Sequence, residues 1–247
     1  MASPTPTRAP QPADAAPAGT LQESQVRAMF DRIAGVYDRM NGVMTAGLHH
    51  RWRARAAELA AVGPGDRVLD VATGTGDLAI ELAHRVLPGG EVVGADFSTE
   101  MLSRARAKAA EIRFEQANAL ELPYASGEFD AATVGFGARN FADLDRGLGE
   151  MARVVRPGGR VVVLEITTPQ RPPLSTFYGA WFDRVVPLLG RLAGDPEAYE
   201  YLPNSVRRFP GPEALAARMA AAGLTSLRWV ITAGGIIAIH VGQVAEA

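Results

Sequence analysis

The stretch Val68-Leu69-Asp70-Val71-Ala72-Thr73-Gly74-Thr75-Gly76-Asp77-Leu78-Ala79 decides the fold of this chain. It begins as an apolar run, which is typical of a buried parallel strand, and then turns on two glycines into a helical pattern. Glycine lets a backbone pass close to a ligand where a Cβ atom would clash. The N-terminus of the following helix offers free N–H groups to a polar or negative group. The stretch therefore predicts a cofactor-binding loop at the mouth of an α/β sheet.

Two cofactors fit this loop. The pattern Gly74-x-Gly76-x-x-Ala79 matches the dinucleotide fingerprint loosely, and Asp96 follows about 20 residues later, where a ribose ligand is expected. Methyltransferases that use S-adenosylmethionine (SAM) have the same strand, loop and helix, with one acidic residue on the first strand, here Asp70, and another ending the second. A tight turn that binds nothing is a third interpretation. The loop by itself leaves all three open.

Composition narrows the classes of function. The chain has 247 residues, 47% of them hydrophobic, and a formal net charge of -2, which is enough apolar material for a full core and gives no basic field for nucleic acid. It contains no cysteine, which excludes disulfides, a thiol nucleophile and cysteine-ligated metals. None of the four histidines has the spacing of zinc ligands. We therefore expect neither a metal nor a nucleic-acid partner.

The N-terminal segment differs in composition from the rest of the chain. Residues 1–20 are rich in proline and alanine, with almost no large apolar side chain, and we expect a disordered tail there. The segment lacks the apolar core of a secretory signal, and no later stretch is long and apolar enough to span a bilayer. We therefore expect a cytoplasmic protein with a single domain over residues 21–247.

From residue 67 onward, strand and helix patterns alternate, which predicts a doubly wound, mostly parallel α/β sheet. The pair Ala233-Gly234 is a hairpin signal between the last two strands. An antiparallel hairpin after five βα units favours the seven-stranded methyltransferase plan over that of a nucleotide-dependent dehydrogenase. The predicted strands span 67–71, 91–95, 112–116, 129–136, 159–166, 226–232 and 235–243, and the predicted helices span 77–87, 98–110, 143–154 and 212–222.

Two further segments stand outside this alternation. A helical extension over about 23–61 precedes the first strand, and its part at 37–52 is dense in polar, aromatic and methionine residues. The extension either packs on the sheet or forms a lid over cofactor and substrate. An insertion over about 168–210 carries an apolar helical stripe, which is either core or the wall of a substrate channel. The stripe consists of Phe177, Tyr178, Trp181, Phe182, Val185 and Val186.

Polar residues follow three predicted strands at their carboxyl ends, where open α/β sheets bind ligands. Asp96 ends the second strand, and its carboxylate can accept hydrogen bonds from both ribose hydroxyls of SAM or NAD. Asn118, followed by Ala119, comes after the third strand, and its amide can bind an adenine edge or stabilise its own turn. Arg139 and Asn140 follow the fourth strand and should stand beside the reacting centre, unless Arg139 forms a structural ion pair.

Three stretches resemble the bacterial demethylmenaquinone and ubiquinone C-methyltransferases, within about residues 26–242. Tyr37-Asp38-x-Met40-Asn41, with His49 and Trp52, resembles the N-terminal signature of that family, and Thr45 replaces its usual serine. Phe136-Gly137-Ala138-Arg139-Asn140 resembles its Phe-Gly-x-Arg-Asn segment, although Gly135 stands where serine is common. Arg153-Val-Val-Arg156-Pro-Gly-Gly, together with Glu165, resembles the second signature of the family. In this signature Arg156 replaces the usual lysine, and Thr167 replaces the usual serine.

This resemblance implies a SAM-dependent methyltransferase of Rossmann-like fold. The implied reaction moves the methyl group of SAM to a ring carbon of 2-demethylmenaquinol, a prenylated naphthoquinol, and gives menaquinol without a metal. The cofactor positions of the family correspond here to Thr75, Asp96 and the Asn118-Ala119 pair. Together with the loop itself, the predicted cofactor site comprises Asp70, Gly74, Thr75, Gly76, Asp96, Asn118 and Ala119.

The chemistry of such a transfer assigns roles to four residues. A ring carbon beside a hydroxyl is a poor nucleophile until that hydroxyl loses its proton, so the site must favour a phenolate-like form and align it. Arg139 does not give up its proton readily and is predicted to stabilise the oxyanion, while Asn140 and Tyr37 orient the hydroxyl. His49 and a bound water are the candidate bases.

Several interpretations stay open at this point. Methylation of another quinol or aromatic compound is the nearest alternative. An NAD(P)-dependent oxidoreductase and a non-catalytic SAM-binding module are alternatives of other classes. A long apolar prenyl chain on the substrate would make peripheral contact with the inner face of the cell membrane useful, and a homodimer is a further open expectation.

Overall fold

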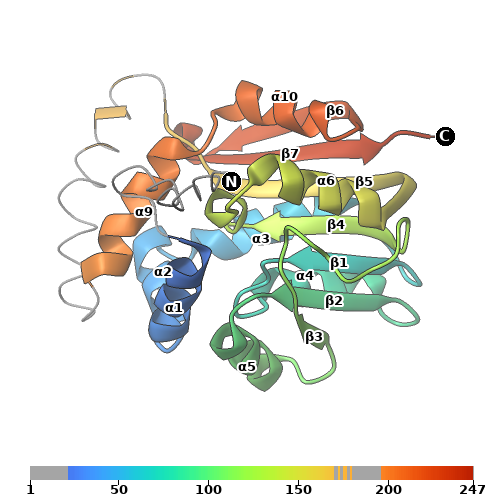
Figure 1. Cartoon of the computed structure of the whole chain (residues 1–247), viewed down its shortest axis with the longest axis horizontal. Coiled ribbons are helices and arrows are strands. Elements are labelled where there is room, and N and C mark those ends of the chain that lie inside the picture. The colour runs from blue at the N-terminus through green and yellow to red at the C-terminus, as the bar shows by residue number, and fades with distance from the viewer. Residues whose placement is uncertain (1–21, 170–171, 173–174, 177–178, 180–195, 247) are drawn as a thin grey trace, which may run out of the picture.

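We describe a computed structural model of the chain (Figure 1). It describes residues 22–169, 172, 175–176, 179 and 196–246, with the backbone only for 196–200. The tail predicted over residues 1–20 lies outside the described residues. So does the apolar stripe that the sequence predicts between residues 177 and 186.

A seven-stranded sheet forms the centre of the molecule. The strand order is β3-β2-β1-β4-β5-β7-β6, and β7 runs antiparallel to both of its neighbours. The first five strands are parallel, as the alternation of strand and helix predicts. The strands are β1 (Arg67–Val71), β2 (Glu91–Asp96), β3 (Arg113–Gln116), β4 (Phe129–Gly135), β5 (Val155–Ile166), β6 (Leu224–Thr232) and β7 (Ile237–Val244).

Helices cover both faces of the sheet. Side chains alternate along a strand, so Val68 packs with α3, α4 and α5 on one face, while Leu69 packs with α6 and α10 on the other. Both clusters are fully apolar, which explains why the central strands read as continuous hydrophobic runs. The described helices are α1 (Glu23–Ile33), α2 (Tyr37–Thr45), α3 (Leu48–Ala60), α4 (Asp77–Val86), α5 (Thr99–Lys108), α6 (Leu144–Val154), α9 (Pro196–Arg208) and α10 (Pro212–Ala221).

The fifth strand differs from its predicted bounds. The sequence predicts a strand at 159–166 after a turn at Pro157-Gly158-Gly159, but β5 begins at Val155. Val155 pairs with Phe129, and the register then shifts before Arg160 pairs with Ala131. The turn residues are therefore absorbed as an irregularity within the strand, where the positive φ of Gly158, 77°, suits glycine. The hairpin signal at 233–234 is confirmed as a 3₁₀ turn, η3 (Ala233–Gly235), between β6 and β7.

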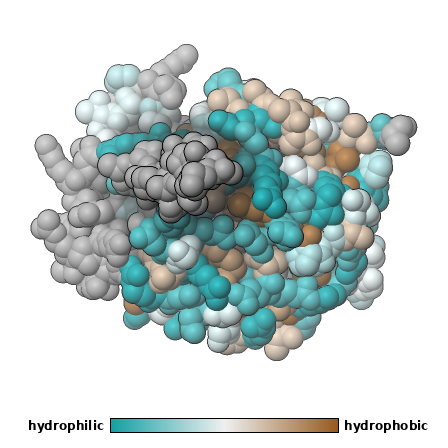
Figure 2. Space-filling view, in the orientation of Figure 1, coloured by the Kyte–Doolittle hydropathy of each residue, from teal (hydrophilic) through white to brown (hydrophobic). Residues whose placement is uncertain are grey.

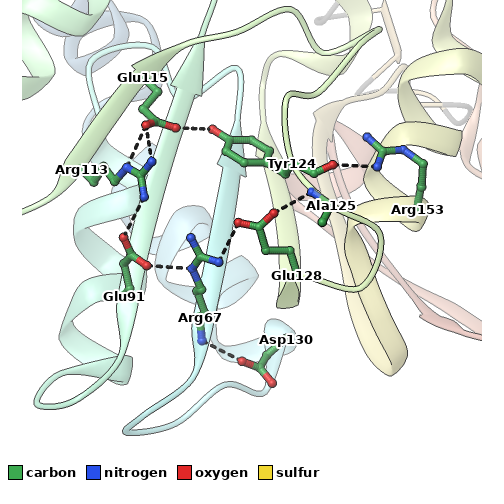
Figure 3. A network of polar contacts seen from close by, with 9 residues as sticks. All are labelled: Arg67, Glu91, Arg113, Glu115, Tyr124, Ala125, Glu128, Asp130 and Arg153. Carbon is green, nitrogen blue, oxygen red and sulfur yellow. Dashed lines mark hydrogen bonds and ion pairs between the residues drawn. The ribbon is translucent and has the colours of Figure 1, made fainter.

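Ion pairs cross the amino-terminal ends of the parallel strands (Figure 3). At the start of β1, Arg67 contacts Glu91 of β2 at 2.7 Å and Glu128, which precedes β4, at 2.7 Å. Its backbone N–H donates to Asp130 at 2.7 Å, and Arg113 of β3 lies 3.5 Å from Glu91. These charges satisfy one another, so this edge of the sheet holds its strands together and leaves few polar groups unpaired for a ligand.

The opposite edge of the sheet is covered by the helical extension. Figure 1 shows α1, α2 and α9 grouped beyond the carboxyl ends of the parallel strands. The third helix of the extension, α3, instead packs on the sheet through Ala56, Ala57 and Ala60. The packing interpretation therefore applies to α3, and the lid interpretation stays a prediction for α1 and α2. The coloured part of the face seen in Figure 2 is mainly hydrophilic, with hydrophobic residues in small separate areas.

Candidate active site

The loop between β1 and α4 has the backbone that its glycines predict. Gly74 and Gly76 have φ angles of 57° and 85°, in the left-handed region that favours glycine. A Cβ atom on Gly76 would meet the Phe114 ring at 3.0 Å, whereas a Cβ atom on Gly74 would meet nothing within 4 Å. Gly76 is therefore required by packing. Gly74 faces open space and leaves room for a ligand to approach the backbone.

Asp96 ends β2 beside this loop and is almost fully buried, with 5% of its surface exposed. Its carboxylate accepts hydrogen bonds from the backbone N–H of Gly74 at 2.8 Å and of Ser98 at 2.9 Å. Burial raises its pKa to about 6 despite these two bonds. The N-cap of α5 is Ser98, whose hydroxyl accepts from the N–H of Met101. Asp96 is thus free of a capping role.

A small cavity of about 60 Å³ opens next to Asp96 and Gly74. Asn118 and Ala119, for which the sequence predicts contact with the cofactor, line this cavity. The Asn118 side chain donates to Glu23 of α1 at 2.7 Å, and its oxygen accepts from the N–H of Leu120 at 2.9 Å, so it also stabilises its own turn. The remaining wall is largely apolar and aromatic, and comprises Phe30, Tyr37, Ala72, Phe97, Met101, Ala117, Phe136, Gly137, Asn140, Phe141 and Ala142.

Three predicted cofactor residues, Asp70, Thr75 and Gly76, lie behind this wall rather than on it. Asp70 is buried in β1 and accepts hydrogen bonds from the hydroxyls of Thr73 and Thr133, both at 2.6 Å. Burial raises its pKa to about 6. Asp70 therefore ties the loop to the neighbouring strand β4, and shapes the cavity from beneath.

Thr75 belongs to a cluster that joins α2 to the loop. Its hydroxyl donates to Asp38 at 2.6 Å and accepts from Lys108 at 3.0 Å. Lys108, the only lysine of the chain, also lies 2.6 Å from Asp38 and 2.8 Å from Asp77. We call Asp38, Thr75, Asp77 and Lys108 the clasp, because they connect α2, the cofactor loop, α4 and α5.

A second and larger cavity, of about 530 Å³, adjoins the first. Tyr37 and Phe136 line both cavities. Phe136 is held at a φ of 62°, which is unusual for a residue other than glycine and marks a position fixed by its surroundings. The second cavity is mostly apolar, and its walls include Val43, Met44, Leu48, Trp52, Ile166, Leu202, Ala233, Ile236 and Ile237.

Arg139 reaches the second cavity while it forms a buried ion pair. Its Nη1 atom lies 3.0 Å from both carboxylate oxygens of Glu165 and also donates to the carbonyl of Phe136. The two side chains are only 7% and 1% exposed. Burial disfavours the charged guanidinium, but Glu165 outweighs that effect and the pKa of Arg139 is raised. Within the described residues its buried Nε atom has no hydrogen-bond partner, so the guanidinium keeps donors available.

His49 and Asn140 complete the polar part of the site. His49 lines the second cavity, is 4% exposed, and has its Nδ1 atom 2.7 Å from the Thr45 hydroxyl. Asn140 lies in a short 3₁₀ turn, η1 (Ala138–Asn140), and lines the first cavity. Its side-chain oxygen accepts from the hydroxyl of Tyr201 on α9 at 3.2 Å. All four residues that the sequence predicts as catalytic therefore line one of the two cavities, and only Tyr37 lines both.

Several cavity residues escaped the sequence analysis. Phe97 directly follows Asp96, and Leu120 follows the Asn118-Ala119 pair, so their neighbours in sequence carried the only available signal. Glu165 was noted as part of a signature, but its pairing with Arg139 depends on β4 and β5 lying side by side. For the described residues, no group of three or more histidine or acidic side chains is placed to hold a metal ion.

The fold and the two cavities together define a class. A sheet of order 3-2-1-4-5-7-6 with an antiparallel seventh strand, and a buried acidic residue at the end of β2, are those of a SAM-dependent methyltransferase. Residues 19–244 match the model of the ubiE/COQ5 methyltransferase family. The chain therefore belongs to the ubiE/COQ5 methyltransferase family. This assignment favours the methyltransferase interpretation of the loop over the NAD(P)-dependent one.

Relatives of known name agree with this family. The chain is 52% identical over 220 residues to the demethylmenaquinone methyltransferase of Thermus thermophilus, covering 87% of this chain and 99% of that protein. It is 47% identical over 238 residues to that of Deinococcus radiodurans, covering 92% and 96%. It is 40% identical over 230 residues to the ubiquinone/menaquinone biosynthesis C-methyltransferase UbiE of Hahella chejuensis, covering 90% and 92%.

Solved structures support the fold alone, because their sequences are distant. The crystal structure of a SAM-dependent methyltransferase from Thermotoga maritima, described as a possible histamine N-methyltransferase, has a TM-score of 0.61 at 19% identity and covers 88% of this chain and 98% of that one. The [4+2]-cyclase SpnF has a TM-score of 0.69 at 19% identity, covering 92% and 98%. Since a cyclase shares the fold, the reaction must be argued from the site.

Proposed function

We propose that this protein transfers the methyl group of SAM to a ring carbon of 2-demethylmenaquinol and so forms menaquinol. The observation that carries the proposal is the junction of two unlike cavities, which share Tyr37 and Phe136. One has a buried carboxylate suited to ribose hydroxyls, and the other is large, apolar and edged by Arg139 and His49. Such a pair suits a nucleoside-like methyl donor on one side and a hydroxylated aromatic acceptor with an apolar chain on the other.

The walls of the first cavity have the chemistry that SAM requires, and a cavity of about 60 Å³ would have to widen to admit the whole cofactor. Asp96 is an acceptor-only carboxylate that can bind two hydroxyls, and the open side of Gly74 leaves the backbone accessible. Asn118, Phe97 and Leu120 offer an amide edge and apolar faces for a purine ring. When bound, SAM would supply an electrophilic methyl group on its sulfonium.

The second cavity fits the acceptor. Aromatic and aliphatic side chains form most of its walls, and its volume of about 530 Å³ lies within the range of small-molecule sites. Arg139 would stabilise the negative charge that develops on a substrate oxygen, with the donors that Glu165 leaves free. Tyr37, which lines both cavities, would orient the substrate hydroxyl together with Asn140.

The test is direct. Purified protein is incubated with SAM and a short-chain 2-demethylmenaquinol under reducing conditions, and products are analysed by mass. We expect one added methyl group on a ring carbon and stoichiometric S-adenosylhomocysteine. Asp96→Ala serves as the inactive control. If SAM stabilises the protein but no methylated quinol forms, a non-catalytic SAM-binding module is favoured. If only other aromatic compounds are methylated, the enzyme is a methyltransferase of a different substrate class.

Contact with a membrane surface is part of the same proposal. Among the described residues, no helix is long and apolar enough to cross a bilayer. Val43 and Leu48, which line the second cavity, are nevertheless 64% and 42% exposed. Two exposed cations, Arg39 and Arg51, stand about one helical turn from them. An apolar rim flanked by cations suits the headgroup region of an anionic bilayer, from which a prenylated quinol would enter. The homodimer stays a prediction.

A further inference from the structure

The hydroxyl of Thr45 sits between two partners and can satisfy them in only one way. Its Oγ1 atom lies 2.7 Å from the carbonyl oxygen of Asn41 and 2.7 Å from Nδ1 of His49. A hydroxyl has one proton, and a carbonyl oxygen can only accept. Thr45 must therefore donate to Asn41 and accept from an N–H on Nδ1 of His49. This chain of two hydrogen bonds fixes neutral His49 as the tautomer whose lone pair is on Nε2.

The surroundings of His49 keep its ring neutral. His50 stacks on it with ring centroids 4.0 Å apart, Arg53 stands one turn further along α3, and Asp38 and Asp77 face it from α2 and α4. Burial, followed by the positive charge of Arg53, lowers the pKa of His49 to about 4. Arg53 itself pairs with Asp77 at 3.4 Å. At neutral pH the lone pair of His49 is therefore available.

The Nε2 atom is the free end of this arrangement. His49 lines the second cavity together with Tyr37 and Arg139, and the hydrogen bond that its ring forms with a described residue is the one at Nδ1. A buried imidazole that is anchored at one nitrogen and unpaired at the other has the form of a general base held ready for a ligand.

We propose that Nε2 of His49 takes the hydroxyl proton of the quinol, and that Thr45 is the positioning residue that aims this lone pair into the cavity. The inference rests on the proposed function and adds to it the identity of the base. Removal of the hydroxyl proton drives an electron pair into the ring, and the ring carbon bonds to the methyl carbon as the carbon–sulfur bond breaks toward sulfur. The ring carbon then loses its own hydrogen as a proton, the oxygen recovers one from the imidazolium, and one proton leaves to water.

Burial makes His49 a weak base while the cavity is empty. The imidazolium is stabilised only while the substrate oxyanion stands beside it, and Arg139 shares that charge. Once the methyl group has been transferred, the same burial returns the proton to the oxygen. The hydroxyl of Thr45 also selects the tautomer of His49. A side chain at position 45 that cannot accept a hydrogen bond from Nδ1 would allow the other tautomer, which has its proton on Nε2 and cannot act as a base there.

Two measurements on Thr45→Val, Thr45→Ser and His49→Ala test this inference. In the wild type, nitrogen NMR of histidine-labelled protein should show His49, identified by its loss in His49→Ala, with a proton on Nδ1. Thr45→Val should populate the Nε2–H form and lower kcat on the order of 10-fold, while His49→Ala should lower it by roughly 10²–10⁴-fold. KM for quinol and the Kd of SAM should stay close to those of the wild type. Thr45→Ser should keep both the tautomer and the rate.

Matched controls separate this effect from damage to the fold. Thr225→Val removes an exposed hydroxyl on β6, and His84→Ala removes an exposed histidine on α4; neither should alter kcat. A wild-type tautomer with the proton on Nε2, or an unchanged kcat in Thr45→Val, overturns the inference even if the protein is an active methyltransferase. If the wild type methylates no quinol, the proposed function fails and the base assignment with it, whatever the tautomer.

Discussion

Arg139 holds two roles that a single substitution cannot separate. It is the partner of buried Glu165 and, in the proposed reaction, the group that stabilises the oxyanion. Removing one partner of a buried ion pair leaves an unpaired charge and commonly destabilises a protein by about 3–5 kcal/mol. Arg139→Ala would therefore unfold the protein more easily and stop the reaction, whichever role matters for catalysis.

A double substitution resolves the two roles. In Arg139→Met with Glu165→Gln no unpaired charge remains, and we expect the melting temperature to return to within a few degrees of wild type. The kcat should stay on the order of 10²–10³-fold low, the usual loss for one oxyanion donor, while the Kd of SAM is unchanged. Arg139→Lys keeps the positive charge but loses the planar guanidinium, so its kcat should lie between that of the double variant and that of the wild type. Recovery of kcat together with stability in the double variant would leave Arg139 a purely structural role.

Asp96 predicts a pH dependence of cofactor affinity. Its pKa is raised to about 6, and the ionised form is the one that accepts from two hydroxyls. The affinity is therefore present above pH 6 and is lost as the pH falls, with a Kd that rises about 10-fold between pH 7 and pH 5. Calorimetric titration with SAM from pH 5 to 8 measures this. Asp96→Asn should bind more weakly with a flat profile, and a flat wild-type profile would contradict the ribose assignment.

At the residue scale, the site was partly predictable because several of its residues stand at the carboxyl ends of predicted strands. Asp96, Asn118 and Arg139 were found because each follows a strand, and Gly74 because it follows the first one. Asp70 and Thr75 were expected at the cofactor but lie behind the cavity wall. Glu165 as the partner of Arg139, and Thr45 as the partner of His49, need the relative placement of side chains that no spacing in the sequence reports.

At the scale of elements, α2 is the piece on which both cavities depend. It carries Tyr37 at their junction, and it is fastened to the cofactor loop by the clasp of Asp38, Thr75, Asp77 and Lys108. No residue of α2 is fully buried, although Met40 and Met44 pack, partly buried, against Met29 and Val206. The clasp adds the polar contacts that join this helix to the cofactor loop.

Loss of the clasp should weaken cofactor binding more than stability. Lys108→Met removes the cation that Asp38 and Asp77 share, and leaves Asp77 with Arg53 alone at 3.4 Å. Each partly exposed pair contributes about 0.2–1 kcal/mol, so we expect a Kd for SAM roughly 3- to 10-fold higher, with a melting temperature within about two degrees of wild type. Arg146→Met, which removes an exposed cation from α6, is the control. A Kd that equals that of the control would show that α2 is held in place by other contacts.

The regular elements were predictable because burial imposes a period on the sequence. Strands β1, β2 and β4 have apolar runs bounded by turns, and α4, α5 and α6 show helical repeats between them. The early start of β5 was missed because Val155 follows α6 without any turn signal, and its pairing with Phe129 is decided by β4. The clasp was likewise hidden, since α2 and α5 are well separated in the sequence from the cofactor loop and α4, to which it joins them.

At the scale of the whole molecule, the two ends of the sheet have different surfaces. The amino-terminal edge is closed by the ion pairs around Arg67 (Figure 3). The carboxyl edge holds both cavities, and the rim of the larger one exposes Val43 and Leu48. In the membrane contact that we propose, this end of the sheet would meet the bilayer through the rim, because the overall charge of -2 would not attract an anionic surface.

The rim therefore gives the last prediction. Val43→Asp and Leu48→Asp add charge where apolar side chains would enter the headgroup region, at a cost of burial of roughly 1.5–3 kcal/mol for each side chain. We expect turnover of a long-chain quinol in vesicles that contain anionic lipid to fall about 10-fold or more, on the scale of that cost. Turnover of a short-chain quinol in detergent-free buffer should be nearly unchanged. Leu87→Asp alters an apolar residue that is 48% exposed at the other end of the sheet, and it should affect neither assay. Equal losses on both substrates would show that Val43 and Leu48 serve the cavity itself, and unchanged rates on vesicles would remove this rim as the entry route.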